Sequence, residues 1–214
     1  QPVAGQYRFA QVVRDGLVVD FIGAVDLLKE MKTQVEAQTG LELTHAASGF
    51  PPGVPRAEVR AVANVVEAVG LRCTGLIDEP SAANNLLRLR DGAILDVGGG
   101  TTGIAILKDG EVIYTADEAT GGTHFSLVIA GALGISFEEA EELKKDPAQQ
   151  SRLFPHILPV MEKVGCIAAR HLEKFPVTQL ALVGGACAYP GMAKVIQEYT
   201  GVPTFVPEPP LFVT

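Results

Sequence analysis

An α/β fold is the class that the sequence predicts, and three observations lead to it. Apolar residues at helical spacing alternate along the chain with short, almost uniformly apolar runs that suit buried strands. Glycine or proline stands at most boundaries between these segments. The chain has 214 residues, 47% of them hydrophobic and 20% charged, so it can bury a core without disulfides and is not intrinsically disordered.

The first half of the chain is predicted to alternate helices and strands, an order that favours a mixed or parallel sheet. We expect, in order, apolar pieces at 12–21 around an Asp15-Gly16 turn, a helix carrying Val25, Leu28, Met31 and Val35 that stops at Gly40, a strand at 43–50, a helix carrying Val59, Val62, Val66 and Val69 that ends at Gly70, a strand at 71–77, and a helix at 81–89.

The second half is predicted to open with a hairpin and to continue with helices and strands. An Asp109-Gly110 pair between two strand-like runs is a strong hairpin signal. The charge-free run 119–137 contains too many glycines and polar residues for a convincing membrane span, and we expect a helix with glycine-marked ends. We expect strands at 93–97, 102–108, 111–116, 179–183 and 202–206, an acidic helix opened by a Ser136/Glu139 capping box, and helices at 157–174 and 192–199.

Charge and cysteine usage exclude several classes of protein. The 17 basic and 25 acidic residues give a net charge of −8, which argues against nucleic acid or an anionic membrane as partner. Three widely spaced cysteines form no disulfide framework or zinc motif and suit a reducing cytosol, so a cytoplasmic location is expected. The four histidines are scattered, and we interpret each as a surface or packed residue rather than a ligand.

The sharpest segment for function runs from Asp96 to Gly103. Three consecutive glycines after a buried strand let backbone N–H groups approach an anion, because no side chain intervenes. Asp96 is placed to hold Mg²⁺ through water or to orient an attacking water, and Thr101 and Thr102 offer hydroxyls to phosphate oxygens. The alternative is a tight hairpin turn with an acidic neighbour.

The same glycines match the dinucleotide fingerprint G-x-G-x-x-G at Gly98, Gly100 and Gly103. That fingerprint requires a helix after the last glycine to receive the pyrophosphate. Here only five residues separate Gly103 from the Asp109-Gly110 turn, so no helix fits. We therefore expect a strand–turn–strand and disfavour a dinucleotide site.

Three further features are also compatible with a nucleotide-binding site. Gly184-Gly185-Ala186 follows an apolar strand and leaves a flat surface suitable for a base or ribose. Gly121-Gly122-Thr123 precedes a predicted helix, and the backbone of Glu79 is restricted by Pro80. Each has a structural alternative as a turn, but their combination and order favour a phosphate-binding site.

In that combination the chain resembles the actin-like ATPase superfamily, which includes DnaK-type chaperones, MreB and FtsA. The run 95–102 resembles its second phosphate loop, 78–83 its first connecting segment, 183–191 its adenosine loop, and 14–21 the segment after the first phosphate hairpin of MreB-like members. The runs 114–122 and 48–53 resemble those of ethanolamine-utilisation members of the superfamily. The likeness covers nearly the whole chain.

The resemblance implies a ribonuclease H-like fold with two lobes, an N-terminal lobe at 1–91 and a C-terminal lobe at 92–214 that carries the second phosphate loop and the adenosine loop. The Asp-x-Gly-Thr/Ser pattern of the first phosphate loop does not precede Arg14 and Gln1 is not a natural start, so we expect an incomplete N-terminal lobe. The implied site holds Mg-ATP, with Asp96 at the metal and Glu79 orienting water. Its implied nucleotide contacts are Gly98, Gly99, Gly100, Thr101, Thr102, Gly121, Gly122, Glu162, Gly184, Gly185 and Ala186.

Two classes of function follow from the resemblance. The first is an ATP-driven, chaperone-like or reactivating factor with weak Mg-dependent ATPase activity, acting on ethanolamine-utilisation enzymes or on shell proteins of a bacterial microcompartment. The second is a scaffold that keeps the fold without turnover, or a filament-associated protein of MreB or FtsA type. Neither requires a transmembrane segment or nucleic acid.

Overall fold

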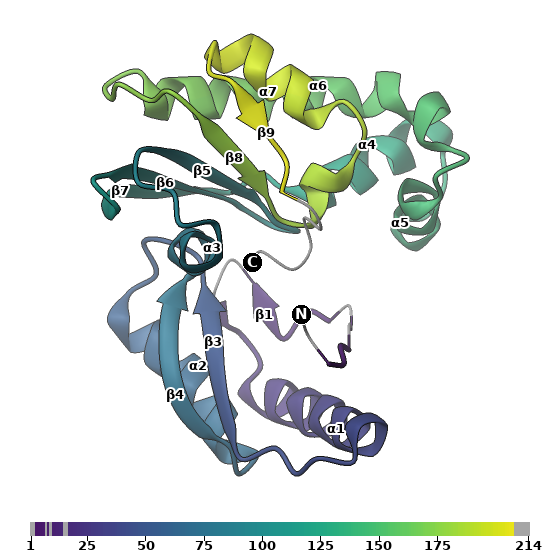
Figure 1. Ribbon diagram of the computed structural model, residues 1–214. Coiled ribbons are helices and arrows are strands. Elements are labelled where there is room, and N and C mark those ends of the chain that lie inside the picture. The colour runs from purple at the N-terminus through teal and green to yellow at the C-terminus, as the bar shows by residue number, and fades with distance from the viewer. Residues whose placement is uncertain (1–2, 7, 9, 15–16, 208–214) are drawn as a thin grey trace. The chain divides into compact units, whose positions relative to one another are not determined.

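The computed structural model describes residues 3–6, 8, 10–14 and 17–207. The chain forms two compact units, residues 1–79 and residues 80–214. Each unit contains its own sheet and its own helices. Figure 1 shows the helices and strands of each unit.

Unit 1 contains two small sheets and two helices. Strands β1 (Val13–Arg14) and β2 (Leu17–Val18) form an antiparallel hairpin, and the predicted Asp15-Gly16 turn lies outside the described residues. Strands β3 (His45–Phe50) and β4 (Arg72–Asp78) pair in parallel. Helix α2 (Arg56–Ala68) connects them and packs on β4, on β3 and on α1 (Phe21–Thr39). The helix–strand alternation predicted for this half is confirmed.

The ends of α1 show why the sequence forms a helix there. The Asp20 carboxylate accepts a 2.9 Å hydrogen bond from the Gly23 N–H, which satisfies one of the unpaired donors of the first turn. At the other end Gly40 adopts a left-handed φ of 69° and donates its N–H to Glu36. This is the glycine stop that the sequence predicts.

Unit 2 is built on a five-stranded sheet of order β7-β6-β5-β8-β9. Strands β5 (Gly92–Val97), β6 (Thr102–Lys108) and β7 (Glu111–Glu118) are antiparallel neighbours, whereas β8 (Leu180–Val183) and β9 (Thr204–Phe205) continue from β5 in parallel. Asp109 and Gly110 both have positive φ, as a two-residue hairpin requires. The predicted strands at 93–97 and 102–108 and the hairpin between β6 and β7 are confirmed.

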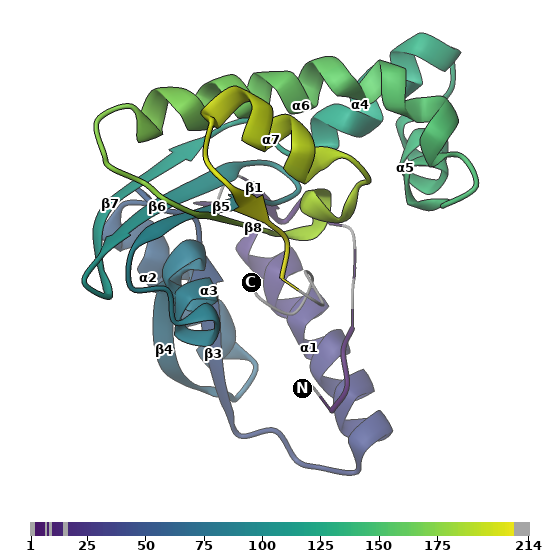
Figure 2. The same ribbon diagram turned by 45° about the horizontal axis from the view of Figure 1, so that its top comes forward.

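Helices cover both faces of this sheet. On one face lie α4 (Gly122–Leu133), α6 (Gln150–Leu172) and α7 (Met192–Thr200). Figures 1 and 2 show α6 and α7 together on this face. Helix α5 (Phe137–Lys145) packs on α4 and α6 and opens with the predicted Ser136/Glu139 capping box. On the other face α3 (Glu79–Leu87) packs Ala83 and Leu87 against Ile94 and Val183.

Two helices differ from their predicted bounds, and prolines explain both. Helix α6 begins at Gln150 rather than at 157 and contains Pro155 and Pro159. Burial of its apolar stripe, which includes Leu153 and Ile157, outweighs the lost backbone hydrogen bonds. Helix α3 begins at Glu79 rather than at 81, because proline is tolerated in a first turn. Strand β9 is also shorter than predicted.

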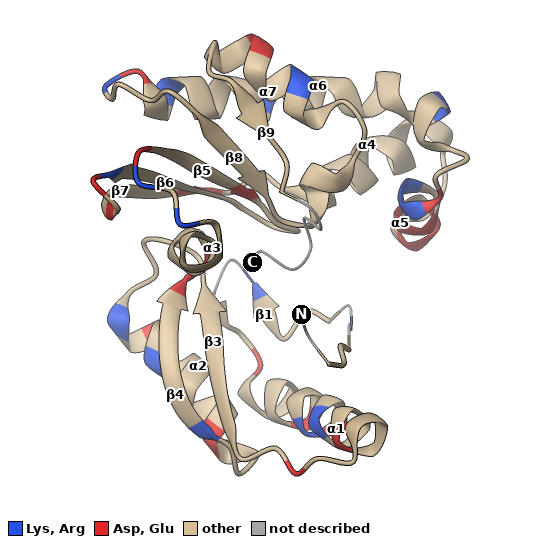
Figure 3. Ribbon diagram, in the orientation of Figure 1, with Lys and Arg blue, Asp and Glu red and all other residues tan. Residues whose placement is uncertain are grey.

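The compact units divide after Glu79, the first residue of α3, because the rest of this helix packs on the sheet of unit 2. The lobe boundary expected at 91/92 stays a prediction. Figure 3 shows that Lys and Arg are spread over many elements, while Asp and Glu gather on α5.

Candidate functional site

The turn after β5 is built almost entirely from glycine. The Gly98 N–H donates to the Thr101 carbonyl at 3.0 Å, and Val97 pairs with Thr102 on the returning strand. This confirms the predicted strand–turn–strand and removes the dinucleotide interpretation. Gly99 and Gly100 are exposed, and a Cβ added at Gly99 would meet nothing within 4 Å. The tip of the turn therefore has open space beside its backbone.

The start of α4 holds this turn in place. The N–H groups of Gly122 and Thr123 donate to the carbonyls of Gly98 and Gly99, each at 2.8 Å. A Cβ on Gly121 would lie 2.7 Å from both of those carbonyl oxygens, so only glycine permits the approach. The predicted signals at 98–100 and 121–122 are thus one structure: the first N–H groups of α4 are used to fix the turn.

The glycine segment after β8 joins the same place. Gly184 has a φ of 89°, and a Cβ there would overlap the Asp96 carboxylate and lie 2.6 Å from the Val97 carbonyl oxygen. Ala186 approaches α4 so closely that a Cβ on Gly122 would lie 3.3 Å from the Ala186 methyl group. Three segments far apart in sequence therefore meet at the end of the sheet where the parallel strands β5 and β8 finish, the usual ligand edge of an α/β sheet.

Asp96 is the charged residue at the centre of this arrangement, with 4% of its surface exposed. Its neighbour Cys187 donates its thiol to the Gly184 carbonyl at 2.7 Å. Burial, together with the negative charge of Asp96, raises the pKa of Cys187 to about 12. The thiol is therefore protonated near neutral pH and is a packing group rather than a nucleophile.

Sequence reasoning missed a cation at the glycine segment that starts α4. The Lys144 ammonium on α5 donates to the Gly122 carbonyl at 3.2 Å, to the Ser126 hydroxyl at 3.0 Å and to the Glu141 carboxylate at 2.6 Å. Burial raises the pKa of Glu141, but hydrogen bonds from Lys144 and Ser126 outweigh it, so the net pKa lies below the ordinary value. The Glu-x-x-Lys spacing within an otherwise acidic helix is the signal that points to this pair.

The remaining predicted site residues of unit 2 differ in exposure and in hydrogen bonding. Gly185 is exposed and opens the short 3₁₀ turn Gly185–Ala188. Thr101 is buried within the turn after β5, whereas the fully buried Thr102 hydroxyl donates to the Thr120 carbonyl. Thr102 thus ties β6 to the segment that leads into α4, and a phosphate contact by its hydroxyl has no support in this geometry.

Glu162 lies on α6 and interacts with Tyr199 of α7. Burial, together with the charge of Glu162 on the neighbouring helix, raises the pKa of Tyr199 on α7. The segment after β8 instead reaches α6 near its start, where Tyr189 donates to the Gln150 carbonyl at 2.9 Å. An adenine or ribose contact by Glu162 stays a prediction.

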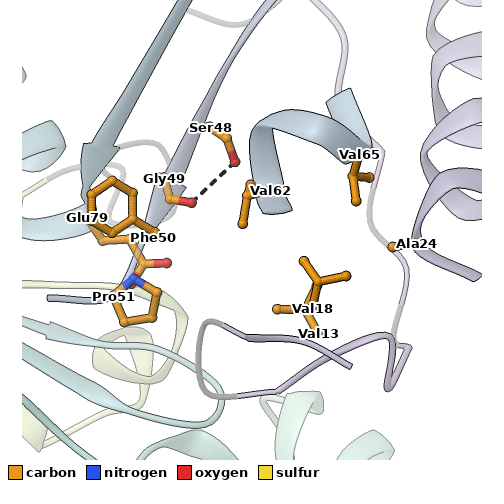
Figure 4. Close-up of a pocket in the computed structure, with 10 residues that line it drawn as sticks. All are labelled: Val13, Val18, Ala24, Ser48, Gly49, Phe50, Pro51, Val62, Val65 and Glu79. Carbon is orange, nitrogen blue, oxygen red and sulfur yellow. Dashed lines mark hydrogen bonds between the residues drawn. The ribbon is translucent and has the colours of Figure 1, made fainter. Parts of the chain in front are cut away.

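Glu79, in unit 1, lines an apolar cavity of about 210 Å³. Figure 4 shows Val13 and Val18 of the hairpin on the side opposite Val62 of α2, with Glu79 beside the Phe50–Pro51 segment. A Cβ at Gly49 would lie 3.3 Å from the Glu79 Cγ, so the glycine leaves room for this side chain. The water-orienting role of Glu79 stays a prediction.

Within residues 3–6, 8, 10–14 and 17–207, no three His, Cys, Asp or Glu side chains gather into a metal-binding group. The same residues include no helix that is both long and apolar enough to traverse a bilayer. Of the four histidines, His124 accepts from the Gly121 N–H, and His171 contacts Tyr114 and Glu118.

Comparison with known proteins supports the fold and specifies the family. The chain matches the MreB/Mbl protein family over residues 4–144 and the cell division protein FtsA family over residues 93–214. A crystal structure of MreB 5 of Spiroplasma citri bound to AMPPNP has the same fold, with a TM-score of 0.80 at 19% identity, covering 96% of this chain and 76% of that one. These matches confirm the actin-like ATPase fold.

Two relatives are much more similar in sequence. The ethanolamine utilization protein EutJ of Escherichia coli is 44% identical over the whole of this chain, which spans 76% of its length. The crystal structure of EutJ from Carboxydothermus hydrogenoformans superposes with a TM-score of 0.90 at 41% identity, covering 97% of this chain and 76% of that one. With its converging glycine segments on an actin-like sheet, the chain belongs to the EutJ family of ethanolamine utilisation proteins, within the actin-like ATPase superfamily.

Proposed function

We propose that this protein binds ATP at the end of the unit 2 sheet where the three glycine segments meet. The observation that carries the proposal is their convergence: the N–H groups of Gly122 and Thr123 hold the turn at 98–101, and Gly184 lies against Asp96. In the described part of the chain, the N–H groups of Gly99 and Gly100 donate to no backbone or side-chain acceptor. Free N–H groups on an exposed glycine turn suit phosphate oxygens.

The residues present also fit a magnesium ion accompanying the nucleotide. Mg²⁺ prefers carboxylate and phosphate oxygens and keeps several waters, and Asp96 is a buried carboxylate beside the glycine turn. We assign Asp96 to that hydrated ion, whose chemistry when bound is to neutralise charge on the phosphates. The Lys144 ammonium, paired with Glu141, donates to the Gly122 carbonyl and so supports the start of α4 that holds the same turn.

In this proposal, different segments of the chain contact different parts of the nucleotide. The turn at 98–101 positions the phosphates, and the flat Gly184–Ala186 segment faces the nucleoside. Phosphoryl transfer depends mainly on positioning and electrostatic stabilisation, so weak Mg-dependent ATPase activity is compatible with this set of residues. Support for nucleotide binding also comes from the AMPPNP complex of the MreB 5 fold relative.

In the cell, the proposed role is that of a chaperone-like or reactivating factor for ethanolamine-utilisation proteins. The sequence identity to EutJ supports the link to ethanolamine utilisation. We propose enzymes or shell proteins of a bacterial microcompartment as partners, with action in the cytoplasm. The second candidate is a scaffold that binds nucleotide without turnover, and the fold shared with MreB and FtsA relatives favours it over a purely catalytic protein.

A titration separates these possibilities. Mg-ATP and Mg-ADP are titrated by calorimetry into the 214-residue chain and into Asp96→Ala, and phosphate release is followed in parallel. We expect wild-type binding that the variant weakens at least tenfold while its circular dichroism is unchanged. Binding without phosphate release selects the scaffold, and equal binding by the two chains refutes the assigned role of Asp96.

A further inference from the structure

A second carboxylate shares a row of the unit 2 sheet with Asp96. On adjacent antiparallel strands, Asp96 lies opposite Gly103, and Gly103 lies opposite Asp117. Residues directly opposite one another across strands point to the same face of a sheet. Asp96 and Asp117 therefore flank Gly103 on one face, with no side chain on the residue between them.

The two neighbours of Asp117 along β7 show which face of the sheet its side chain is on. The residues before and after it, Ala116 and Glu118, belong to the α6 side: Ala116 packs on the large core, and Glu118 contacts Arg170 and His171. Because side chains alternate along a strand, Asp117 faces away from α6.

Packing likewise places Asp96. Its neighbours Leu95 and Val97 belong to the large core on the α6 side, whereas Ile94 packs against Ala83 of α3. Asp96 therefore lies on the α3 face, the same face as Asp117. Asp117 precedes Gly121 by only four residues, so the row lies at the end of the sheet that carries the glycine turn.

We infer that Asp117 is a second carboxylate for the hydrated divalent cation that accompanies the nucleotide; the inference rests on the proposed nucleotide site. Neighbouring strands are about 4.8 Å apart, so the two Cα atoms are separated by about 10 Å. A bare Mg²⁺ ion, with bonds of about 2.1 Å, is too small to reach both carboxylates, whereas an ion that keeps its waters spans the gap.

The test uses ADP as probe, titrated by calorimetry into wild type and Asp117→Asn, once with Mg²⁺ and once with EDTA. Binding of Mn²⁺ in the presence of ADP is followed by electron paramagnetic resonance. Glu111→Gln is the matched control, because Glu111 is exposed at the opposite end of the same strand and the charge change is the same. Asp117→Ser serves as a second variant if the amide perturbs folding.

We expect Mg²⁺ to strengthen ADP binding at least tenfold in wild type and in Glu111→Gln, and less than threefold in Asp117→Asn. Affinities in EDTA should agree within twofold for all three chains, and Asp117→Asn should bind Mn²⁺ more weakly. An unchanged Mg²⁺ effect in both Asp117 variants overturns the inference while leaving the nucleotide site standing. Absence of ADP and Mn²⁺ binding in wild type overturns the proposed site and this inference together.

Discussion

The two units bury their strands to different degrees. Every residue of β5 and β8 in unit 2 is buried, whereas β3 in unit 1 alternates between exposed and half-buried positions. Among the described residues, the buried apolar side chains of unit 1 are few: Ala24, Pro51, Pro52, Val65, Val66 and Leu71. Unit 2 combines a large core on both faces of its sheet with turns in which glycine is sterically required. Its converging glycine segments are therefore held more rigidly by packing than the strands of unit 1.

The largest expected effect comes from truncating the unit 2 core. Leu182→Ala removes a fully buried side chain from β8 and should lower the free energy of unfolding by about 2–5 kcal/mol. Leu76→Ala on β4, where the leucine is only half-buried, should cost about 1 kcal/mol or less, since part of its surface already contacts water. Urea unfolding followed by circular dichroism measures both. Equal losses would contradict the contrast between the units.

A second prediction concerns Gly184. Gly184→Ala places a methyl group against Asp96 and adds strain from a φ of 89°, so it should destabilise the protein by about 2–4 kcal/mol. The control is Gly201→Ala, which also has a positive φ of 69° but meets nothing within 4 Å and should cost about 1 kcal/mol. Thermal melts of the two variants compare the steric contribution directly, and matching melts would show that the segment after β8 moves freely.

Gly121 provides a smaller test on a single helix. Gly121→Ala pushes the turn at 98–101 away from α4 and should cost about 1–3 kcal/mol, with weakened nucleotide binding as a second readout. Gly131→Ala, on the open surface of the same helix, should instead stabilise by about 0.5–1 kcal/mol because alanine favours helix. Should Gly121→Ala be neutral in both readouts, the turn does not depend on its contact with α4.

The smallest effect is a pH dependence through Glu141. Its folded-state pKa is lowered, so its contribution to stability is fully present above the unfolded-state pKa, near 4.5, and is lost as pH falls through the folded value. The difference in melting temperature between wild type and Glu141→Gln should therefore be present at pH 7 and shrink below about pH 4.5. A constant difference across that range would mean that Glu141 acts through packing rather than charge.

Local patterns predicted most of the fold, because strand and helix periodicity survive wherever one face is buried. The Ser136/Glu139 capping box, the Asp109-Gly110 turn and the Gly40 stop were all confirmed. The start of α6 was wrong by seven residues, because tertiary burial of Leu153 overrode the signal of two prolines.

The candidate site could be predicted only one segment at a time. The sequence marks Gly98, Gly121 and Gly184 separately, but their meeting depends on strand order, which no local pattern contains. Lys144 was missed because its helix looks like a solvated acidic surface, and its contact with Gly122 arises from packing of α5 on α4. The pairing of Asp96 and Asp117 across Gly103 likewise requires the register of three strands.

Hydrogen exchange of backbone amides, with and without Mg-ADP, tests the central claim most directly. Binding at the converging segments should slow exchange at 98–101 and at 184–188, where backbone N–H groups face the ligand or the segment beside it, while the distant Asp109-Gly110 turn stays unchanged. Protection confined to other parts of the chain, or unchanged exchange at both segments when calorimetry shows that ADP is bound, would contradict the account.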